Sequence, residues 1–385
     1  MNHLLTGRYA VHLIDSLLQG TAPENKPEEI SFEDLYRLSV FHNVSTMCLS
    51  ALKKTDQEIE PELLKKWENR SALSTGQSMT QLHERKSIYE ALEENKIDYL
   101  PLKGCLLKDM YPDPNYREMS DLDILIREKD ADQIKSLMEN MGYTCDAFRQ
   151  YVHDGYYRKP FMHVEMHYRL LSEEHFRIHS WDVTHGDFFF NPWKYAHKAE
   201  GCRYCFDEDD LYVYLIMHLA KHYLGSGAGI RQFTDLYYLN QNLHLDKDAV
   251  YEKLDQFGLK EFCITAEHLV ETWYQGREPD EKTSEMESVV FRSGSYGTQD
   301  ISLNRQMDKY EKEHSSSTFL AHYMRERLFP SYDELKNQYP GLRDHPERLP
   351  VYWTKRILTK GVQAVPQKLK DAKAISRILK ERKGK

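Results

Sequence analysis

The sequence predicts an α+β protein in which a small α/β core lies between N- and C-terminal helical regions. Two observations lead to this prediction. Apolar residues recur at helical spacing through residues 1–92, and this pattern returns from residue 209 onward. Between these regions, short apolar runs end in clusters of polar residues, which is typical of strands. With 385 residues, the chain is also long enough for two or three domains.

The N-terminal region, residues 1–92, is expected to be helical. Ser31 and Asp34 have the spacing of a capping box, which satisfies the free N–H groups at the start of a helix. Apolar residues then follow at helical intervals from Phe32 to Phe41. The remaining residues of this region are charged with scattered apolar positions, which suits further helices.

The central segment, residues 93–195, is expected to form the α/β core. Its predicted strands are residues 97–102, 120–126 and 163–170. The Lys103-Gly104 turn follows the first strand and opens a short helical pattern that Pro112 stops. Asp130 caps a second helix, which Gly142 ends.

Helices are predicted again through residues 196–280. The stretch DDLYVYLIMHLAKHYL, which begins at Asp209, is a strong helix closed by the glycine-rich loop GSGAG. Residues 277–316 are polar and are expected to be rich in loops. Residues 281–385 are read as loops and short helices with a basic tail, because four prolines fall between positions 330 and 350.

Charge and cysteine usage limit the classes of partner and compartment. The net charge of −9 disfavours a protein whose main task is to bind long nucleic acids. Residues 355–385 nevertheless carry eleven Lys or Arg and two acids, so this tail is either a solvated basic helix or a site for an anionic partner. No signal peptide or membrane-spanning stretch is expected. Six scattered cysteines favour free thiols in a cytoplasmic protein.

Acidic residues on two predicted strands form the main candidate site. Asp121 and Asp123 are two positions apart, so in a strand both carboxylates project from one face, where they would repel each other unless a cation lies between them. His163, Glu165 and His167 share one face of the later strand by the same rule. If these faces coincide, Asp121, Asp123 and Glu165 suit a hard cation such as Mg²⁺ or Mn²⁺.

The turn before the first aspartate has features of a phosphate site. Gly104 allows the backbone to approach a phosphate closely, and the helix that follows it would favour an anion at its N-terminus. Lys103 adds a positive charge beside it. Two metal ions near such a turn can stabilise the attacking and leaving oxygens of a phosphoryl displacement.

These residues carry a resemblance to a known family. The stretch LPLKGCLLKDMYPDPNYREMSDLDILI, residues 100–126, resembles the uncharacterised nucleotidyltransferase family of the DNA polymerase β-like nucleotidyltransferase superfamily. HVEMHYRL, the helix around His218 and His222, the pair Arg231 and Asp235, and RSGSYGT at 292–298 are also similar to this family.

The resemblance implies a small mixed-sheet nucleotidyltransferase core and a metal-dependent reaction. A nucleoside monophosphate would pass from an NTP to an acceptor hydroxyl. The acidic body of the chain favours a small acceptor over a long nucleic acid. Asp121 and Asp123 would bind metal, and Glu165 would act as base and share one ion. The residues expected to contact the nucleotide are Lys103, Gly104, Arg117, Ser120, Arg231 and Asp235.

Several alternatives stay open. Cys105 stands where the wider superfamily has Gly or Ser, so the chain could instead be an inactive nucleotide-binding or regulatory module. A third interpretation is a metallohydrolase built on His163, Glu165, His167 and the His218–His222 pair. Arg117 is either a phosphate contact, a brace for the carboxylates or a surface charge, and Arg231–Asp235 has the spacing of an ordinary ion pair within a helix.

Overall fold

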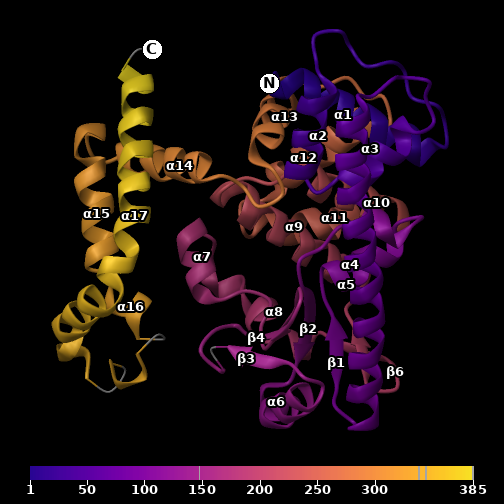
Figure 1. The fold of residues 1–385 in the computed structure, drawn as a ribbon. Coiled ribbons are helices and arrows are strands. Elements are labelled where there is room, and N and C mark those ends of the chain that lie inside the picture. Colours follow the sequence, from indigo (N-terminus) through magenta and orange to yellow (C-terminus); the bar gives the residue numbers. More distant parts are fainter. Residues whose placement is uncertain (147, 337–338, 343–344, 384–385) are drawn as a thin grey trace. The chain divides into compact units, whose positions relative to one another are not determined.

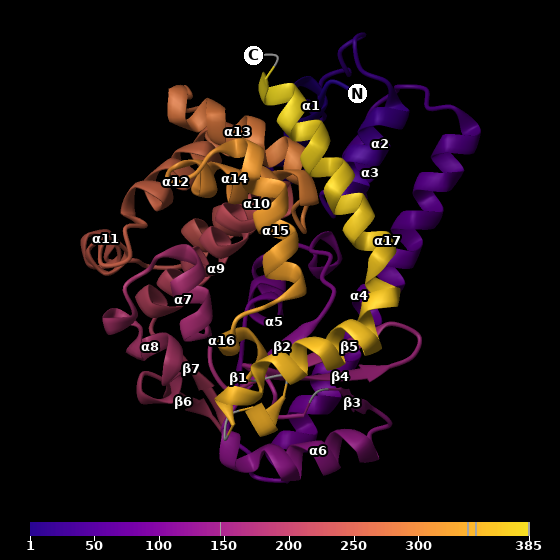
Figure 2. The same cartoon turned by 90° about the vertical axis from the view of Figure 1, so that its left-hand side faces the viewer.

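The structure, a computed structural model, describes residues 1–146, 148–336, 339–342 and 345–383 (Figures 1 and 2). It divides into two compact units, Met1–Gly297 and Thr298–Lys385. The predicted regions 1–92, 93–195 and 196–280 all lie in the first unit.

The described residues of the first unit contain a seven-stranded mixed sheet. Its strands are β1 (Tyr99–Pro101), β2 (Leu122–Ile126), β3 (Thr144–Asp146), β4 (His153–Arg158), β5 (Met162–His167), β6 (His197–Glu200) and β7 (Arg203–Cys205). They lie in the order β3-β4-β5-β2-β1-β7-β6. The pairs β2–β5 and β1–β7 are parallel and the other neighbours are antiparallel. The predicted strands correspond to β1, β2 and β5, whereas the two outer hairpins are additions.

The two faces of the sheet differ in chemistry because side chains alternate along each strand. Leu122, Ile124 and Ile126 of β2 pack in one core with residues of α4 (Pro61–Glu94) and α6 (Ala131–Asn140). Asp121 and Asp123 therefore project from the opposite face. In Figure 1, α4 runs alongside β1 and β2.

Helices from both ends of the first unit share one core. They are α1 (His3–Gln19), α2 (Phe32–Phe41), α3 (Ser45–Leu52), α5 (Gly104–Leu107), α7 (Glu173–His179), α8 (Asp187–Phe190), α9 (Glu208–Gly225), α10 (Ile230–Asn242), α11 (Lys247–Asp255), α12 (Lys260–Tyr274) and α13 (Glu281–Ser293). Ser31 caps α2 as predicted and accepts a hydrogen bond of 3.0 Å from the backbone N–H of Asp34. The N-terminal helix α1 packs against α12 and α13, so regions far apart in sequence form one body.

The second unit is also helical. It contains α14 (Gln299–Glu311), α15 (Phe319–Leu328), α16 (Tyr332–Leu335) and α17 (Leu349–Lys383). The prediction of loops over 277–316 was wrong, because α13 and α14 fill most of that segment; Met286 and Val290 of α13 lie on one helical face and are buried. The prediction of short helices over the tail was also wrong from residue 349 onward. Pro350 lies in the first turn of α17, where proline is tolerated.

Two further findings concern membrane-spanning helices and the cysteines. Within the described residues, no helix is both long and apolar enough to span a bilayer. All six cysteines are free thiols.

Candidate nucleotidyl-transfer site

A cleft of about 350 Å³ lies over the acidic face of the sheet. One wall is formed by β2, β4 and β5, which contribute Asp123, His153 and Glu165. The opposite wall is formed by α9 and α10, which contribute Lys221 and Arg231 among others. The cleft therefore has an acidic strand wall and a basic helix wall.

The three predicted acids lie together on the strand wall. Asp123 of β2 is the direct register partner of Glu165 of β5, so both side chains leave the sheet on the same face. Asp121, two residues before Asp123, projects in the same direction and accepts a hydrogen bond of 2.9 Å from the hydroxyl of Ser120. One carboxylate oxygen each of Asp121 and Glu165 and a ring nitrogen of His163 lie within 4.8 Å of one another.

Of the three acids, Asp123 has the shortest hydrogen bonds to neighbouring side chains. Its Oδ1 accepts hydrogen bonds from Lys103 Nζ at 2.6 Å and from His167 Nε2 at 2.8 Å. Burial opposes ionisation of this carboxyl, but Lys103 and His167 hold its pKa well below the usual range. Burial on its own would lower the pKa of Lys103, yet the charge of Asp123 leaves that pKa raised. Both partners are thus charged.

The backbone at Lys103 is unusual. Its φ is 41°, in a region that side-chain-bearing residues rarely adopt and that costs about 1–3 kcal/mol. The turn directs the ammonium group back over β2 to Asp123, so Lys103 contacts a predicted metal ligand rather than standing free for a phosphate.

Two of the three predicted acids, Asp121 and Glu165, form with His163 a group that suits a hard divalent ion, whereas Asp123 is not part of that group. Burial raises the pKa of Asp121, and the negative charge of Asp123 raises it further. A cation between these groups would relieve that repulsion, and three carboxylates are the ligand type that Mg²⁺ or Mn²⁺ binds. Because Asp123 Oδ1 already accepts two N–H donors, an ion bound at that oxygen would displace the ammonium of Lys103.

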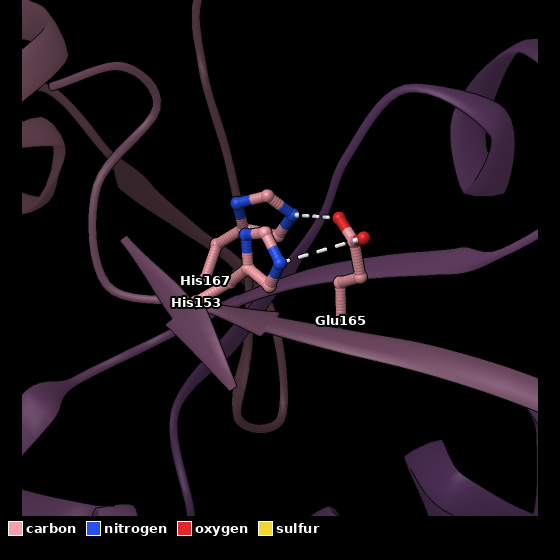
Figure 3. Close-up of side chains that lie close together, drawn as sticks. All are labelled: His153, Glu165 and His167. Atoms are coloured by element: carbon pink, nitrogen blue, oxygen red, sulfur yellow. Dashed lines mark hydrogen bonds and ion pairs between the residues drawn. The ribbon is translucent and has the colours of Figure 1, made fainter. Parts of the chain in front are cut away.

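Two histidines flank Glu165 on the same wall (Figure 3). His167 Nε2 lies 3.2 Å from Glu165 Oε2, and His153 Nε2 lies 3.5 Å from Oε1. Burial favours the protonated acid, but the hydrogen bond from His167 leaves the pKa of Glu165 lowered. Burial and then the charge of His167 lower the pKa of His153 to about 4. His153 was not predicted from the sequence as a site residue, because its strand was not predicted.

Gly104 and Arg117 meet at the edge of the cleft. A Cβ added at Gly104 would lie 2.9 Å from Arg117 Nη1 and 3.1 Å from the sulfur of Met119, so a larger residue would displace the arginine. The helix that follows, α5, is a single turn, so its dipole adds little to anion binding. This corrects the expectation of a helix N-terminus suited to phosphate.

Arg117 is a buried brace rather than a surface charge. Its Nε and Nη2 donate to the two carboxylate oxygens of Asp235 at 2.7 and 2.9 Å, and Tyr111 donates to the same carboxylate at 2.8 Å. Arg231 Nη1 lies 3.8 Å from Asp235, so the pair predicted within α10 is the weaker contact. Arg117 Nη1 and Arg231 Nε are buried and have no hydrogen-bond partner among the described residues.

Cys105 does not enter the cleft. Its side chain is 2% exposed and packs in the core between the sheet and α4, where burial raises the pKa of its thiol to about 12. Although Cys105 is larger than the Gly or Ser of the wider superfamily, its side chain therefore takes up no space above Asp121 and Asp123. This removes the observation that motivated an inactive module.

The helix wall also contains Lys221, which was not predicted from the sequence as a site residue, and the His218–His222 pair. Lys221 of α9 has no hydrogen bond or ion pair within the described chain, and burial together with the charge of Lys103 lowers its pKa to about 8. His218 and His222 contact each other through their Nε2 atoms at 3.1 Å. The available signal was their spacing, since His218, Lys221 and His222 lie on one side of an otherwise apolar helix.

Comparison with known proteins identifies one family. The family described as "Uncharacterised nucleotidyltransferase" matches residues 28–275, which include both walls of the cleft. No curated protein and no solved structure matches the chain.

Proposed function

The chain belongs to the uncharacterised nucleotidyltransferase family, and on this basis we propose that it transfers a nucleoside monophosphate from an NTP to an acceptor hydroxyl. One observation carries the proposal. Asp123 and Glu165 are register partners on parallel strands, with Asp121 beside them and the Lys103-Gly104 turn adjacent, all within one cleft.

In the proposed reaction, the acceptor oxygen forms a bond to the α-phosphorus while the bond from that phosphorus to the β-phosphate oxygen breaks. Pyrophosphate leaves, and Glu165 takes the proton of the acceptor hydroxyl. Phosphoryl transfer depends mainly on positioning and charge stabilisation, so the lowered pKa of Glu165 does not prevent this role.

The metal would supply charge. Mg²⁺ or Mn²⁺ held by Asp121, Asp123 and Glu165 would neutralise the phosphate oxygens and favour attack at the α-phosphorus. The chain's own residues supply the rest. Lys103, once released from Asp123, is placed to contact the triphosphate, and Arg231 and Lys221 present positive charge from the helix wall. Ser120 and His167 orient Asp121 and Asp123.

A binding and transfer experiment tests the proposal. Calorimetric titration of α,β-methylene-ATP and the corresponding GTP, CTP and UTP analogues, each with Mg²⁺, should give binding that Asp123→Asn weakens. Incubation with α-³²P-labelled NTP and a mixture of hydroxyl acceptors should give labelled product. Asp146→Asn, at an exposed position on β3 of the same sheet, is the matched control. Unchanged metal and nucleotide affinity in Asp123→Asn would contradict the proposal.

A second candidate is a metal-dependent hydrolase. It is favoured by the group His153, Glu165 and His167, whose ligand atoms lie within 4.8 Å of one another (Figure 3). Imidazole and carboxylate ligands suit zinc or another transition metal. His218 and His222, included in the original form of this hypothesis, are not part of that group. Elemental analysis of purified protein that detects no zinc, manganese or iron would eliminate this candidate.

A further inference from the structure

A second cavity opens beside the cleft. We call it the α4 groove; it has a volume of about 250 Å³ and is lined by Ser74, Gln77, Ser78 and Gln81 of α4 and by Asn43 and Tyr296. Met119, Ser120 and Tyr296 line both the groove and the cleft. Since Ser120 donates its hydroxyl hydrogen bond to Asp121, the shared boundary lies directly beside the acids.

The buried side of α4 changes from apolar to polar residues where the helix lines the groove. The inward-facing stripe of this helix is apolar near its start, at Leu63 and Trp67, and again near its end, at Ile88 and Leu92. Between them the buried positions are Ser74, Ser78 and Gln81, which line the groove, and Glu84, which does not. A helix normally presents its apolar residues to the interior, so this polar interval needs a cause other than packing.

The outward face of α4 strengthens this point. Leu73 and Met79 lie at solvent-facing positions and are 71% and 62% exposed. In this interval the large apolar residues therefore lie on the exposed side of the helix, whereas serine and glutamine lie on the buried side. Three of the four buried polar positions in this interval, Ser74, Ser78 and Gln81, line the groove, which indicates that their hydroxyls and amide serve a ligand.

Buried polar atoms in the groove lack protein partners. Ser78 is 3% exposed, and its Oγ has no hydrogen-bond partner among the described groups. The same holds for Glu118 Oε1, although Glu118 Oε2 accepts a hydrogen bond of 2.7 Å from Arg70. Gln81 donates to the carbonyl of Met119 at 3.0 Å, which leaves its own amide oxygen as an acceptor. A buried hydroxyl without a partner is unfavourable, so a ligand with hydroxyl groups would stabilise it.

The charge of the groove selects the class of ligand. Arg70 and Glu118 form an ion pair at 2.7 Å and cancel each other, and the other lining side chains are neutral. A phosphorylated or otherwise anionic acceptor would find no unpaired cation there. Neutral hydroxyls and amides instead match the alternating donors and acceptors of a sugar or polyol. Tyr296 is 61% exposed, and its hydroxyl is held by Asn43 at 3.1 Å, so its ring offers a fixed apolar surface to such a molecule.

We propose that the α4 groove binds a neutral polyhydroxylated acceptor, a sugar or polyol, and directs one of its hydroxyls past Ser120 to the acids. This inference rests on the proposed nucleotidyl transfer. The acceptor oxygen forms the new bond to the α-phosphorus, pyrophosphate leaves, and the hydroxyl proton passes to Glu165. The product is a nucleoside monophosphate ester of the sugar or polyol.

Saturation-transfer NMR on the full chain tests the groove directly. The probes are D-mannose, N-acetyl-D-glucosamine and myo-inositol, with glucose 6-phosphate and a 12-nucleotide RNA for comparison. At least one neutral probe should receive saturation from the wild type. Ser78→Leu, which fills the groove, should reduce that signal at least fivefold while the affinity for Mg²⁺ and the NTP analogue stays unchanged.

Ser87→Leu is the matched control, because it makes the same change on α4 nine residues further on, about 13 Å along the helix axis. It should leave the signal intact. Ser78→Ala is the second variant, since it removes the hydroxyl without adding volume, and it should weaken the signal about threefold even if Ser78→Leu fails to fold. No signal from any neutral probe, stronger binding of glucose 6-phosphate or RNA, or an unchanged signal in both Ser78 variants would overturn the inference.

The same samples separate the two proposals. If neutral probes bind in the groove but neither the NTP analogue nor the label transfer is detected, the nucleotidyl-transfer proposal fails and the groove remains a polyol site. If the NTP analogue binds and no neutral probe does, the acceptor inference fails while the donor site stands.

Discussion

The strand wall and the helix wall of the cleft differ in how their charges are paired. On the strand wall, Asp123 accepts from Lys103 and His167, and Glu165 contacts His167. On the helix wall, Lys221 has no partner within the described chain, and Arg231 Nε is buried without one. The acids are therefore held in position by the protein itself, whereas Lys221 is available to a ligand and Arg231 is only partly paired, through Nη1 at 3.8 Å from Asp235. A metal-bound polyphosphate has the complementary arrangement, with a cation toward the acids and anionic oxygens toward the helices.

Loss of the strand-wall base is expected to give the largest effect. Glu165→Gln keeps the size of the side chain but removes its ability to take a proton, so label transfer from α-³²P-NTP should fall by up to about 10⁴-fold. Binding of the NTP analogue should change much less. Equal transfer rates in the variant and the wild type would show that the strand wall does not supply the base.

The next effect concerns the contact that joins the walls. Asp235 of α10 accepts from Arg117, which lies against Gly104, and Arg117 is only 4% exposed. Asp235→Ala leaves the guanidinium buried without its main partner and should lower the free energy of unfolding by about 3–5 kcal/mol. Chemical denaturation measures this.

A double variant sharpens the same test. Arg117→Met with Asp235→Leu removes both charges and should recover part of the lost stability, because no buried charge then lacks a partner. If Asp235→Ala alone costs less than about 1 kcal/mol, the two walls are not joined through this pair.

The difference between the walls also explains how far the sequence could predict the site. The strand wall is encoded locally, because alternation with a period of two places Asp121 and Asp123 on one face and Glu165 on one face of its own strand. The direct pairing of Asp123 with Glu165 then needs only that β2 and β5 be neighbours. The α+β class and its helical flanks were predicted correctly from periodicity and are seen in the structure.

The helix wall could not be predicted in this way. Lys221 reaches the cleft because α9 packs over the sheet, and the spacing of His218, Lys221 and His222 does not show what that side of the helix faces. His153 was missed because the strand HDGYYR has a glycine and little apolar alternation, and it is stabilised by pairing with β5. The α4 groove depends on residues from four separate segments, so only the fold brings its hydroxyls to the acids.

The contact between His42 and α10 of the helix wall should depend on pH. His42 is fully buried, and its Nε2 donates to the carbonyl of Phe291 at 3.2 Å while its Nδ1 accepts from the N–H of Ile230, the first residue of α10, at 3.1 Å. Burial lowers the pKa of His42 to about 4. The unfolded chain, with a pKa near 6.5, thus binds a proton that the folded state excludes between these values.

Stability should therefore fall as pH decreases from about 6.5 to about 4, by about 3 kcal/mol from this group. Denaturation at a series of pH values measures the slope. His42→Gln should remove this part of the slope, and His83→Gln, at an exposed position on α4, should not. An identical slope in the wild type and His42→Gln would place the acid sensitivity elsewhere.

The smallest expected effect tests the unpaired cation itself. At pH 7 Lys221 is charged, because its pKa lies at about 8, so Lys221→Met should weaken binding of the Mg²⁺–NTP analogue about tenfold, or ~1.4 kcal/mol. At pH 9 the free ammonium has largely lost its proton, and the difference between variant and wild type should shrink. Lys282→Met, an exposed lysine paired with Glu261, should have no effect at either pH. A loss that is equal at pH 7 and pH 9 would mean that the side chain acts through packing, and the contrast between a paired acidic wall and an available basic wall would then rest on Arg231 alone.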